Sequence, residues 1–136
     1  MNLPRPAALA FAALSLTACA TAPHLSCAPA QQALIADELF FGTAMPQGQV
    51  TPEQWQAFLS EEVTPRFPQG LSVVSAAGQW RGNDGSLVHE SSYVLTLVHP
   101  DDAASEASIL AIAQAYKTRF RQEAVMRLKQ RACTSF

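Results

Sequence analysis

Residues 71–98 read LSVVSAAGQWRGNDGSLVHESSYVLTLV, two runs rich in β-branched and aromatic residues with a turn-like sequence between them. Its β-branched and aromatic residues are typical of strands, so we expect one strand over Leu71–Arg81 and another over Leu87–Val98. The sequence between them, Gly82-Asn83-Asp84-Gly85, is typical of a turn in a β-hairpin. The stretch therefore predicts two adjacent antiparallel strands.

The turn determines which side chains share a face of this hairpin. We expect a two-residue turn, either Asp84-Gly85 or Asn83-Asp84. With either turn, paired positions place the same residues together on one face of the sheet: Gln79, Arg81, Val88, Glu90 and Ser92. The opposite face then carries Trp80, Leu87 and His89.

The rest of the domain adds two strands and two helices. We expect a first strand over Asp37–Gly42 and a last strand over Ala124–Ser135. A helix begins after Thr51, since Thr51 and Gln54 can form a capping box around a proline at the first helical position. Pro65 ends that helix. Trp55, Phe58, Leu59 and Val63 fall on its apolar face.

The second helix begins near Pro100-Asp101-Asp102, because acidic residues stabilise a helix N-terminus. Its apolar face carries Ile109, Ile112, Tyr116 and Phe120. The element order is therefore β-α-β-β-α-β. This order predicts an α+β, ferredoxin-like fold: a four-stranded antiparallel sheet in the order 4-1-3-2 with two helices on one face.

The N-terminus has the features of an export signal. Residues 7–16 are almost entirely apolar, a run too short to cross a bilayer as a helix but suited to a signal peptide. The following residues, Leu16-Thr17-Ala18-Cys19, resemble the lipobox of bacterial lipoprotein precursors. We therefore expect a signal peptide over residues 1–18 and a lipid on Cys19. The alternative is an ordinary secretory signal with an incidental cysteine.

Lipidation of Cys19 would make the membrane a partner of this protein, since two or more acyl chains anchor a protein stably. Ala20 follows, and the lack of aspartate there resembles the sorting signal for the outer membrane, facing the periplasm, in bacteria with two membranes. Residues 19–34 are rich in small residues and proline, and predict a flexible tether. The folded domain is expected over residues 35–136.

Composition narrows the class of protein. The chain has 136 residues, of which 49% are hydrophobic and 15% charged, with a formal net charge of −2. These values are typical of one globular domain. The small negative charge does not favour a nucleic-acid partner.

Two cysteines remain once Cys19 carries a lipid. Cys27 precedes the first strand and Cys133 lies near the end of the last strand. These strands are neighbours in the predicted sheet, so we expect a Cys27–Cys133 disulfide in an oxidising compartment. The alternative is two separate thiols. Two cysteines so far apart do not predict a metal site.

The last strand alternates basic and apolar residues. Arg127, Lys129 and Arg131 fall on one face, and we expect the apolar face with Met126 and Leu128 to meet the helices. The basic face is either a patch for anions or lipid headgroups, or a means of discouraging pairing at a sheet edge.

Three residues are candidates for ligand binding: Arg66, Arg81 and Glu90. Arg81 and Glu90 could together orient an anionic or hydrogen-bonding ligand, or form a solvated ion pair worth about 1 kcal/mol or less. Arg66 could bind a ligand or hold the end of the first helix. No sequence motif indicates a catalytic residue, a metal or a cofactor, and we expect none.

The third strand is apolar on both faces. Tyr93, Leu95 and Leu97 alternate with Val94, Thr96 and Val98. Helices cover only one face of a ferredoxin-like sheet, and an exposed apolar face marks an interaction site. We therefore expect the open face to form a homodimer contact or a small ligand pocket.

Four sequence blocks resemble the domain-of-unknown-function 3574 family of small bacterial secreted proteins and lipoproteins. The blocks are residues 37–42, residues 55–59, residues 63–71 and residues 78–81, and the resemblance covers about 37–136. It implies one domain and no particular reaction. We therefore expect an envelope lipoprotein with a non-enzymatic binding or interaction domain. The alternative is a small enzyme or ligand carrier that uses the open face with Arg81 and Glu90.

Overall fold

A computed structural model describes residues 26–136. The predicted signal peptide and Cys19 lie outside these residues. Within them, neither helix is both long and apolar enough to cross a membrane. The elements in chain order are β1 (Gln32–Gly42), β2 (Ala44–Met45), β3 (Gly48–Gln49), α1 (Pro52–Phe58), η1 (Leu59–Val63), β4 (Ser72–Arg81), β5 (Leu87–His99), α2 (Ala103–Phe120) and β6 (Met126–Thr134).

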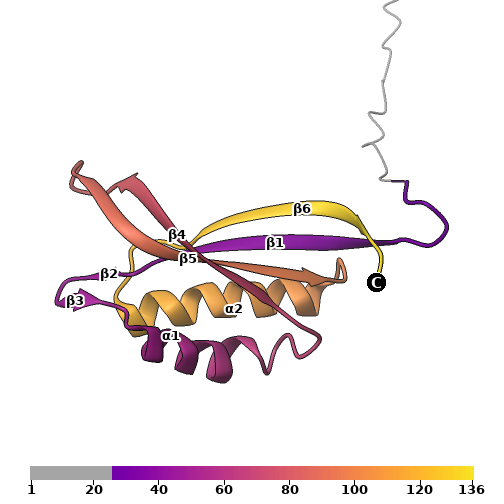
Figure 1. The fold of residues 1–136 in the computed structure, drawn as a ribbon, viewed down its shortest axis with the longest axis horizontal. Helices are drawn as coiled ribbons and strands as arrows, with labels where there is room; N and C mark the ends of the chain where they lie inside the picture. Colours follow the sequence, from indigo (N-terminus) through magenta and orange to yellow (C-terminus); the bar gives the residue numbers. More distant parts are fainter. Residues whose placement is uncertain (1–25) are drawn as a thin grey trace, which may run out of the picture.

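The four long strands form one antiparallel sheet in the order β4-β5-β1-β6. Both helices lie against the same face of this sheet, and the other face is open (Figure 1). This confirms the predicted α+β fold with a four-stranded antiparallel sheet and two helices. When only the long strands are numbered, the observed order is the predicted one viewed from the opposite edge.

The topology differs from the prediction in two details. A two-stranded hairpin, β2–β3, occupies the connection for which we expected a simple loop. The first helix changes from α-helix to the wider π-helix η1 at Leu59. Neither feature alters the order of the main sheet.

The first helix begins as its sequence predicts. The Thr51 side chain accepts a hydrogen bond from Gln54 N, and the Gln54 side chain accepts one from Thr51 N. Two backbone N–H groups that would otherwise lack partners are thus satisfied. Pro52 occupies the first helical position, where its missing N–H costs nothing.

An aromatic cluster fills the space between the sheet and the helices. Phe41 of β1 packs edge-on against Tyr116 of α2, with 4.6 Å between ring centroids, and Trp55 of α1 lies 5.2 Å from Phe41. All three are almost fully buried. The predicted apolar faces of both helices are confirmed, because all eight of their predicted residues are buried.

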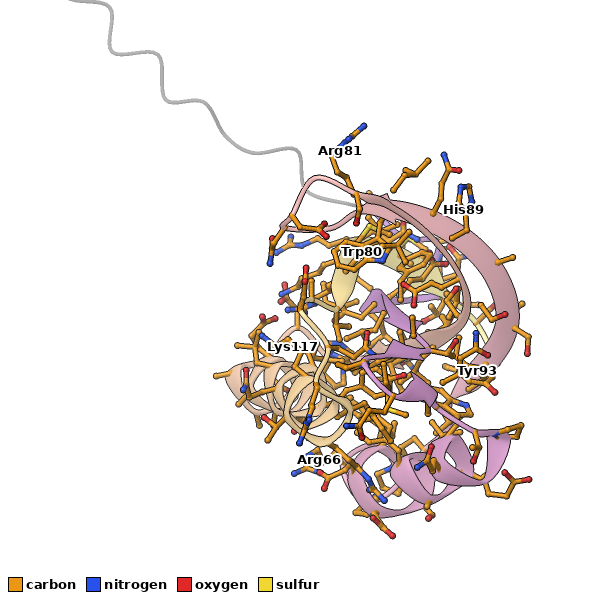
Figure 2. The ribbon with its side chains drawn as sticks, turned by 90° about the vertical axis from the view of Figure 1, so that its left-hand side faces the viewer. Arg66, Trp80, Arg81, His89, Tyr93 and Lys117 are labelled. Atoms are coloured by element: carbon orange, nitrogen blue, oxygen red, sulfur yellow. A yellow bond between two sulfur atoms is a disulfide. The ribbon has the colours of Figure 1, made fainter. Side chains whose placement is uncertain are left out.

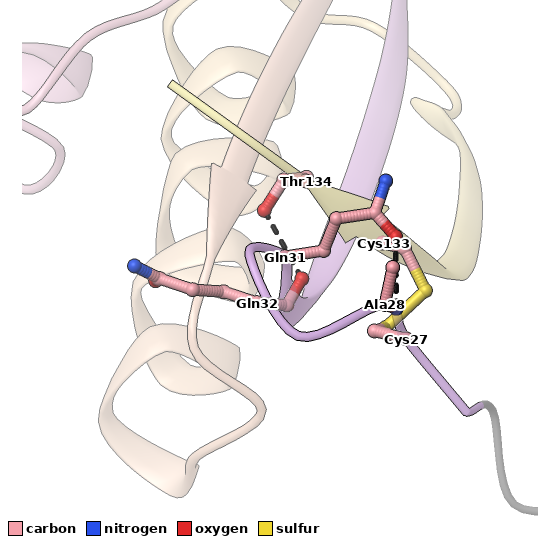
Figure 3. The surroundings of a disulfide bond; sticks show 6 residues. All are labelled: Cys27, Ala28, Gln31, Gln32, Cys133 and Thr134. Carbon is pink, nitrogen blue, oxygen red and sulfur yellow. Dashed lines mark hydrogen bonds between the residues drawn. A yellow bond between two sulfur atoms is a disulfide. The ribbon is translucent and has the colours of Figure 1, made fainter.

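The Cys27–Cys133 disulfide is confirmed, with 5.5 Å between the two Cα atoms. Figure 3 shows it beside the paired ends of β1 and β6, where Thr134 Oγ1 donates to Gln32 O over 3.2 Å. Because β1 begins at Gln32, the chain joins the sheet earlier than the predicted start at Asp37. The end of the predicted tether therefore belongs to the folded domain.

The turn between β4 and β5 contains three residues, so the predicted two-residue turn is wrong. Gly82 N donates to Ser86 O over 2.9 Å and closes the loop. Gly85, the last loop residue, has φ of 85°, a left-handed conformation that favours glycine. Asp84 Oδ1 accepts hydrogen bonds from the backbone N and Oγ of Ser86.

The extra loop residue changes which side chains share a face. Gly78 pairs with Glu90, and Arg81 pairs with Leu87. Since alternate residues share a face, Trp80 lies on the face of Glu90, and Arg81 lies on the opposite face. The predicted grouping of Arg81 with Glu90 is wrong, because a one-residue change of register exchanges the two faces.

The predicted orientation of β6 is also wrong. Arg127 pairs with Leu39, which faces the helices and is fully buried. Met126 and Leu128 lie on the open face, where they are 55% and 50% exposed. β6 takes this orientation because Asp37 is a fully buried carboxylate on the helix side of the sheet, and Arg127 must reach it to neutralise its charge.

Candidate ligand-binding pocket on the open face

The three predicted site residues lie in different environments. Arg66 follows the first helix, where its Nη1 donates to Glu62 O and Glu62 Oε2. Arg81 Nη1 donates to Gly85 O over 2.8 Å and so spans the hairpin turn. Figure 2 shows Arg66 beside the helices and Arg81 pointing away from the domain at the hairpin tip. The structure does not bring them together with Glu90.

Glu90 lies on the open face, folded over the end of β1. Its Oε2 accepts a hydrogen bond from Ala44 N over 2.8 Å. A side chain at Gly42 would collide with this carboxylate, because a Cβ built there lies 2.7 Å from Glu90 Cδ. The glycine therefore makes room for Glu90.

Two neighbouring contacts hold this corner in place. Gln122 Nε2 donates to Ala44 O over 2.5 Å, and Tyr116 Oη donates to Gly42 O over 2.8 Å. Burial, and secondarily the negative charge of Glu90, raises the pKa of Tyr116. The hydroxyl therefore stays protonated and serves as a donor at neutral pH.

A pocket of about 230 Å³ opens beside Glu90 on this face. Its floor comes from β1, one wall from the β4–β5 hairpin, and the other wall from the α2–β6 connection and β6. Its lining is Phe40, Gly42, Gly78, Gln79, Trp80, Glu90, Ser92, Gln122, Ala124 and Met126. The surface is mainly apolar, and Glu90 is its one charged lining residue.

Curvature of the hairpin forms this pocket. Asn83 N, in the hairpin turn, donates to Glu123 Oε2 over 3.3 Å, which joins the turn to the α2–β6 connection. Figure 2 shows Trp80 inside the curve and Arg81 and His89 outside it. Trp80 Nε1 is buried without a hydrogen-bond partner, so the indole is held by packing alone.

A second cluster of polar residues lies between the sheet and α2. Asp37 accepts hydrogen bonds from Arg127 Nε and Nη2, both over 2.7 Å. Arg127 also donates to both carboxylate oxygens of Glu106. Both ring nitrogens of His99 face acceptors, namely Asp37 Oδ2 at 2.8 Å and Pro100 O at 2.7 Å.

These contacts change the acidity of both carboxyl groups. Burial raises the pKa of Asp37, but hydrogen bonds and charge from Arg127 and His99 outweigh it, so this pKa is lowered. Hydrogen bonds from Arg127, then from Lys129, lower the pKa of Glu106 to about 2. The charges are mutually paired, which indicates a structural network rather than a reactive site.

The basic face of β6 belongs to this network. Lys129 Nζ donates to Glu106 over 2.8 Å, and Arg131 Nη2 donates to Asp101 over 2.9 Å. The three predicted cations thus pair with acids of the same domain. This leaves little support for an anion-binding patch there.

The sequence named Glu90 as a candidate, and the structure places it in the pocket lining, but sequence reasoning missed the aromatic lining residues Phe40 and Trp80 and the Asp37 network. One signal for Asp37 was available: it alternates with Ile35, Leu39 and Phe41 on the buried face of β1. An acid in such a position requires a cation. The pocket walls had no comparable signal, because they depend on hairpin curvature.

The structure is a small α+β domain with a mainly apolar pocket on the open face of its sheet. The chain belongs to the family described as "Protein of unknown function (DUF3574)", whose model matches residues 36–136. The predicted resemblance to this family is therefore confirmed. No curated protein sequence gives a significant match.

Solved structures with a similar fold come from different proteins. A phage SAM lyase in complex with S-methyl-5′-thioadenosine has a TM-score of 0.61 and 14% identity, covering 85% of this chain and 97% of that chain. CutA from Synechococcus elongatus, complexed with a Bis-Tris molecule, has a TM-score of 0.51 and 12% identity, covering 77% and 87%. At these identities the likeness concerns the fold alone.

Proposed function

We propose that this chain is an exported bacterial lipoprotein whose ferredoxin-like domain is a non-enzymatic binding module at the cell envelope. The binding site is the pocket beside Glu90, and the lipid on Cys19 is the anchor. The observation that carries the proposal is the apolar pocket on the sheet face that no helix covers. Such concave, mainly apolar surfaces with few polar groups suit small ligands.

The disulfide supports the export part of the proposal. Disulfides persist in oxidising compartments and are rare in the bacterial cytosol. Cys27–Cys133 therefore agrees with a chain that is carried across the inner membrane by the signal over residues 1–18. The lipobox, Leu16 to Cys19, adds anchoring to export, and the absence of aspartate at position 20 favours the outer membrane.

The geometry of the site favours binding through Glu90 without Arg81. Arg81 lies on the opposite face of the hairpin, so the pair cannot orient one ligand. Glu90 is instead accompanied by apolar and aromatic lining residues. This composition suits retention of a ligand, and it makes a binding module a better interpretation than an enzyme built on Arg81 and Glu90.

Incorporation of radiolabelled palmitate tests the anchor. Cells that produce the full chain should label it, and Cys19→Ser should remove the label. Cys27→Ser is the matched control, because it removes a different cysteine and should keep the label. Labelling of the Cys19→Ser variant, or an unlabelled full chain, would contradict lipid attachment at Cys19.

Native mass spectrometry of the lipoprotein extracted from its membrane tests the binding module. We expect a small molecule to accompany the protein and to be lost from a Phe40→Ala variant that still folds. S-methyl-5′-thioadenosine belongs among the reference compounds, because a protein with this fold has been solved with it. The proposal would be contradicted if the extracted protein carried no ligand and the mass spectra showed no binding of any added compound.

Exposed residues of the open face favour a second candidate, a homodimer through this surface. Val74 is 61% exposed and Val98 39% exposed, and Met126 and Leu128 of β6 are exposed on the same face of the sheet. The same mass spectra distinguish the candidates. A dimer that Val74→Lys dissociates, without a bound small molecule, would favour the homodimer.

A further inference from the structure

The pocket has a charge of a single sign. Glu90 is the one charged residue in its lining, and Arg81 points away from it across the hairpin. The corrected register therefore reverses the kind of ligand that the sequence indicated. An arginine and a glutamate together would suit an anion, whereas Glu90 alone suits a cation.

Glu90 also lacks a cationic partner. Within residues 26–136, the carboxylates of Asp37, Asp101 and Glu106 all form ion pairs, but no lysine, arginine or histidine forms one with Glu90. Its Oε2 is occupied by Ala44 N, while Oε1 has no hydrogen-bond partner there. A carboxylate in a mainly apolar pocket gains from a ligand that supplies positive charge.

The apolar residues of the pocket lining favour the same kind of ligand. Phe40 and Trp80 supply two aromatic rings, and Met126 supplies a polarisable thioether. Aromatic rings attract organic cations through the negative charge of their faces, and they also bury apolar groups. The carboxylate and the rings therefore favour a cation with an apolar body for independent reasons.

We propose that the pocket binds a small organic ammonium ion, with its cationic nitrogen against Glu90 and its apolar body against Phe40, Trp80 and Met126. This inference rests on the proposed binding function and names its class of ligand. The pocket volume of about 230 Å³ equals roughly eight water molecules at about 30 Å³ each. The ligand is therefore compact, with a single ring or a short alkyl chain beside the amine.

Three compounds of similar shape test the charge preference: phenethylamine, 2-phenylethanol and phenylacetate. Their affinities are measured by calorimetry on the full lipoprotein in nanodiscs. We expect phenethylamine to bind about tenfold or more tightly than the alcohol, and phenylacetate to bind weakest, because a charge-assisted hydrogen bond contributes more than a neutral one. Added salt should weaken the amine more than the alcohol.

Glu90→Gln is the decisive variant. Its amide oxygen can still accept from Ala44 N, so the fold is retained while the charge is lost. We expect the preference for the amine over the alcohol to disappear. Glu38→Gln is the matched control, because Glu38 is an acid on the same strand and face as Phe40 but outside the pocket lining, and it should keep the preference.

Equal affinities of the amine and the alcohol for the unmodified protein would overturn the inference, as would a preference that survives Glu90→Gln. If the alcohol binds as well as the amine, the pocket still binds ligands and the proposed function stands. If the membrane-extracted protein carries no small molecule and none of the three probes binds, both proposals fail. The two failures are therefore distinguishable.

Discussion

At the scale of single residues, Gly42 and Asp37 are each explained by a contact that involves a carboxylate. Gly42 lacks a side chain because the Glu90 carboxylate occupies the space beside it. Asp37 is tolerated in the core because Arg127 and His99 surround it with donors. In both cases one residue can be understood only through a partner far away in the sequence.

Gly42→Ala should destabilise the domain by about 1–3 kcal/mol, since the new methyl group displaces Glu90 from its position over β1. Urea denaturation measures the loss. The double variant Gly42→Ala with Glu90→Ala should lose less than the two single losses combined, because the collision is then absent. Strictly additive losses would show that the two residues do not compete for this space.

The Glu106 network predicts a dependence of stability on pH. The ordinary pKa of this carboxyl, 4.5, is lowered to about 2 by Arg127 and Lys129. A lowered folded-state pKa stabilises the protein above the unfolded-state value, and this contribution is lost as pH falls towards the folded-state value. The free energy of unfolding should therefore fall between about pH 4.5 and pH 2.

Denaturation at several pH values measures this effect, and Glu106→Gln is the comparison. The variant should show a smaller fall over the same range, because its amide does not titrate. Asp37 remains and contributes in the same direction, since its pKa is also lowered. A variant with an unchanged pH dependence would show that Glu106 does not contribute.

At the scale of elements, the β4–β5 hairpin determines the site. Its three-residue turn places Trp80 with Glu90 inside the curve and sends Arg81 outside. A two-residue turn would exchange these positions and leave a different set of side chains in the pocket. The turn therefore controls the chemistry of a surface that lies several residues away.

Gly85→Ala should destabilise the hairpin by about 1 kcal/mol, because alanine is strained at φ of 85°. Gly85→Asn should cost less, since asparagine tolerates left-handed conformations. Thermal unfolding of the two variants ranks them. Equal melting temperatures for alanine, asparagine and glycine would contradict this turn geometry.

The limits of sequence reasoning also appear at this scale. The first helix was predictable because Thr51 and Gln54 act within four residues. The hairpin register was not, since asparagine, aspartate and glycine suit both two- and three-residue turns. The orientation of β6 could not be predicted either, because its alternating pattern is compatible with either face towards the helices. The orientation is set by Asp37 on β1, which requires Arg127 as its partner.

At the scale of the whole molecule, the Cys27–Cys133 bond joins residues that are 106 positions apart. Such a long closed loop restricts the unfolded chain strongly. Replacing both cysteines with alanine should lower the free energy of unfolding by about 4–5 kcal/mol in the chain-entropy model. Urea denaturation of this double variant beside the oxidised protein measures the difference, and equal stabilities would refute it.

The position of this disulfide has a mechanical consequence. The chain leaves the domain at Cys27, at the opposite end of the sheet from the β4–β5 hairpin (Figure 1). A pulling force from a membrane anchor would act on the domain at Cys27. Without the disulfide, this force would separate β1 from β6 one residue pair at a time. The Cys27–Cys133 disulfide transmits the force to β1 and β6 together. If the proposed lipid anchor is present, the disulfide would therefore help the domain to stay folded when its N-terminal end is pulled.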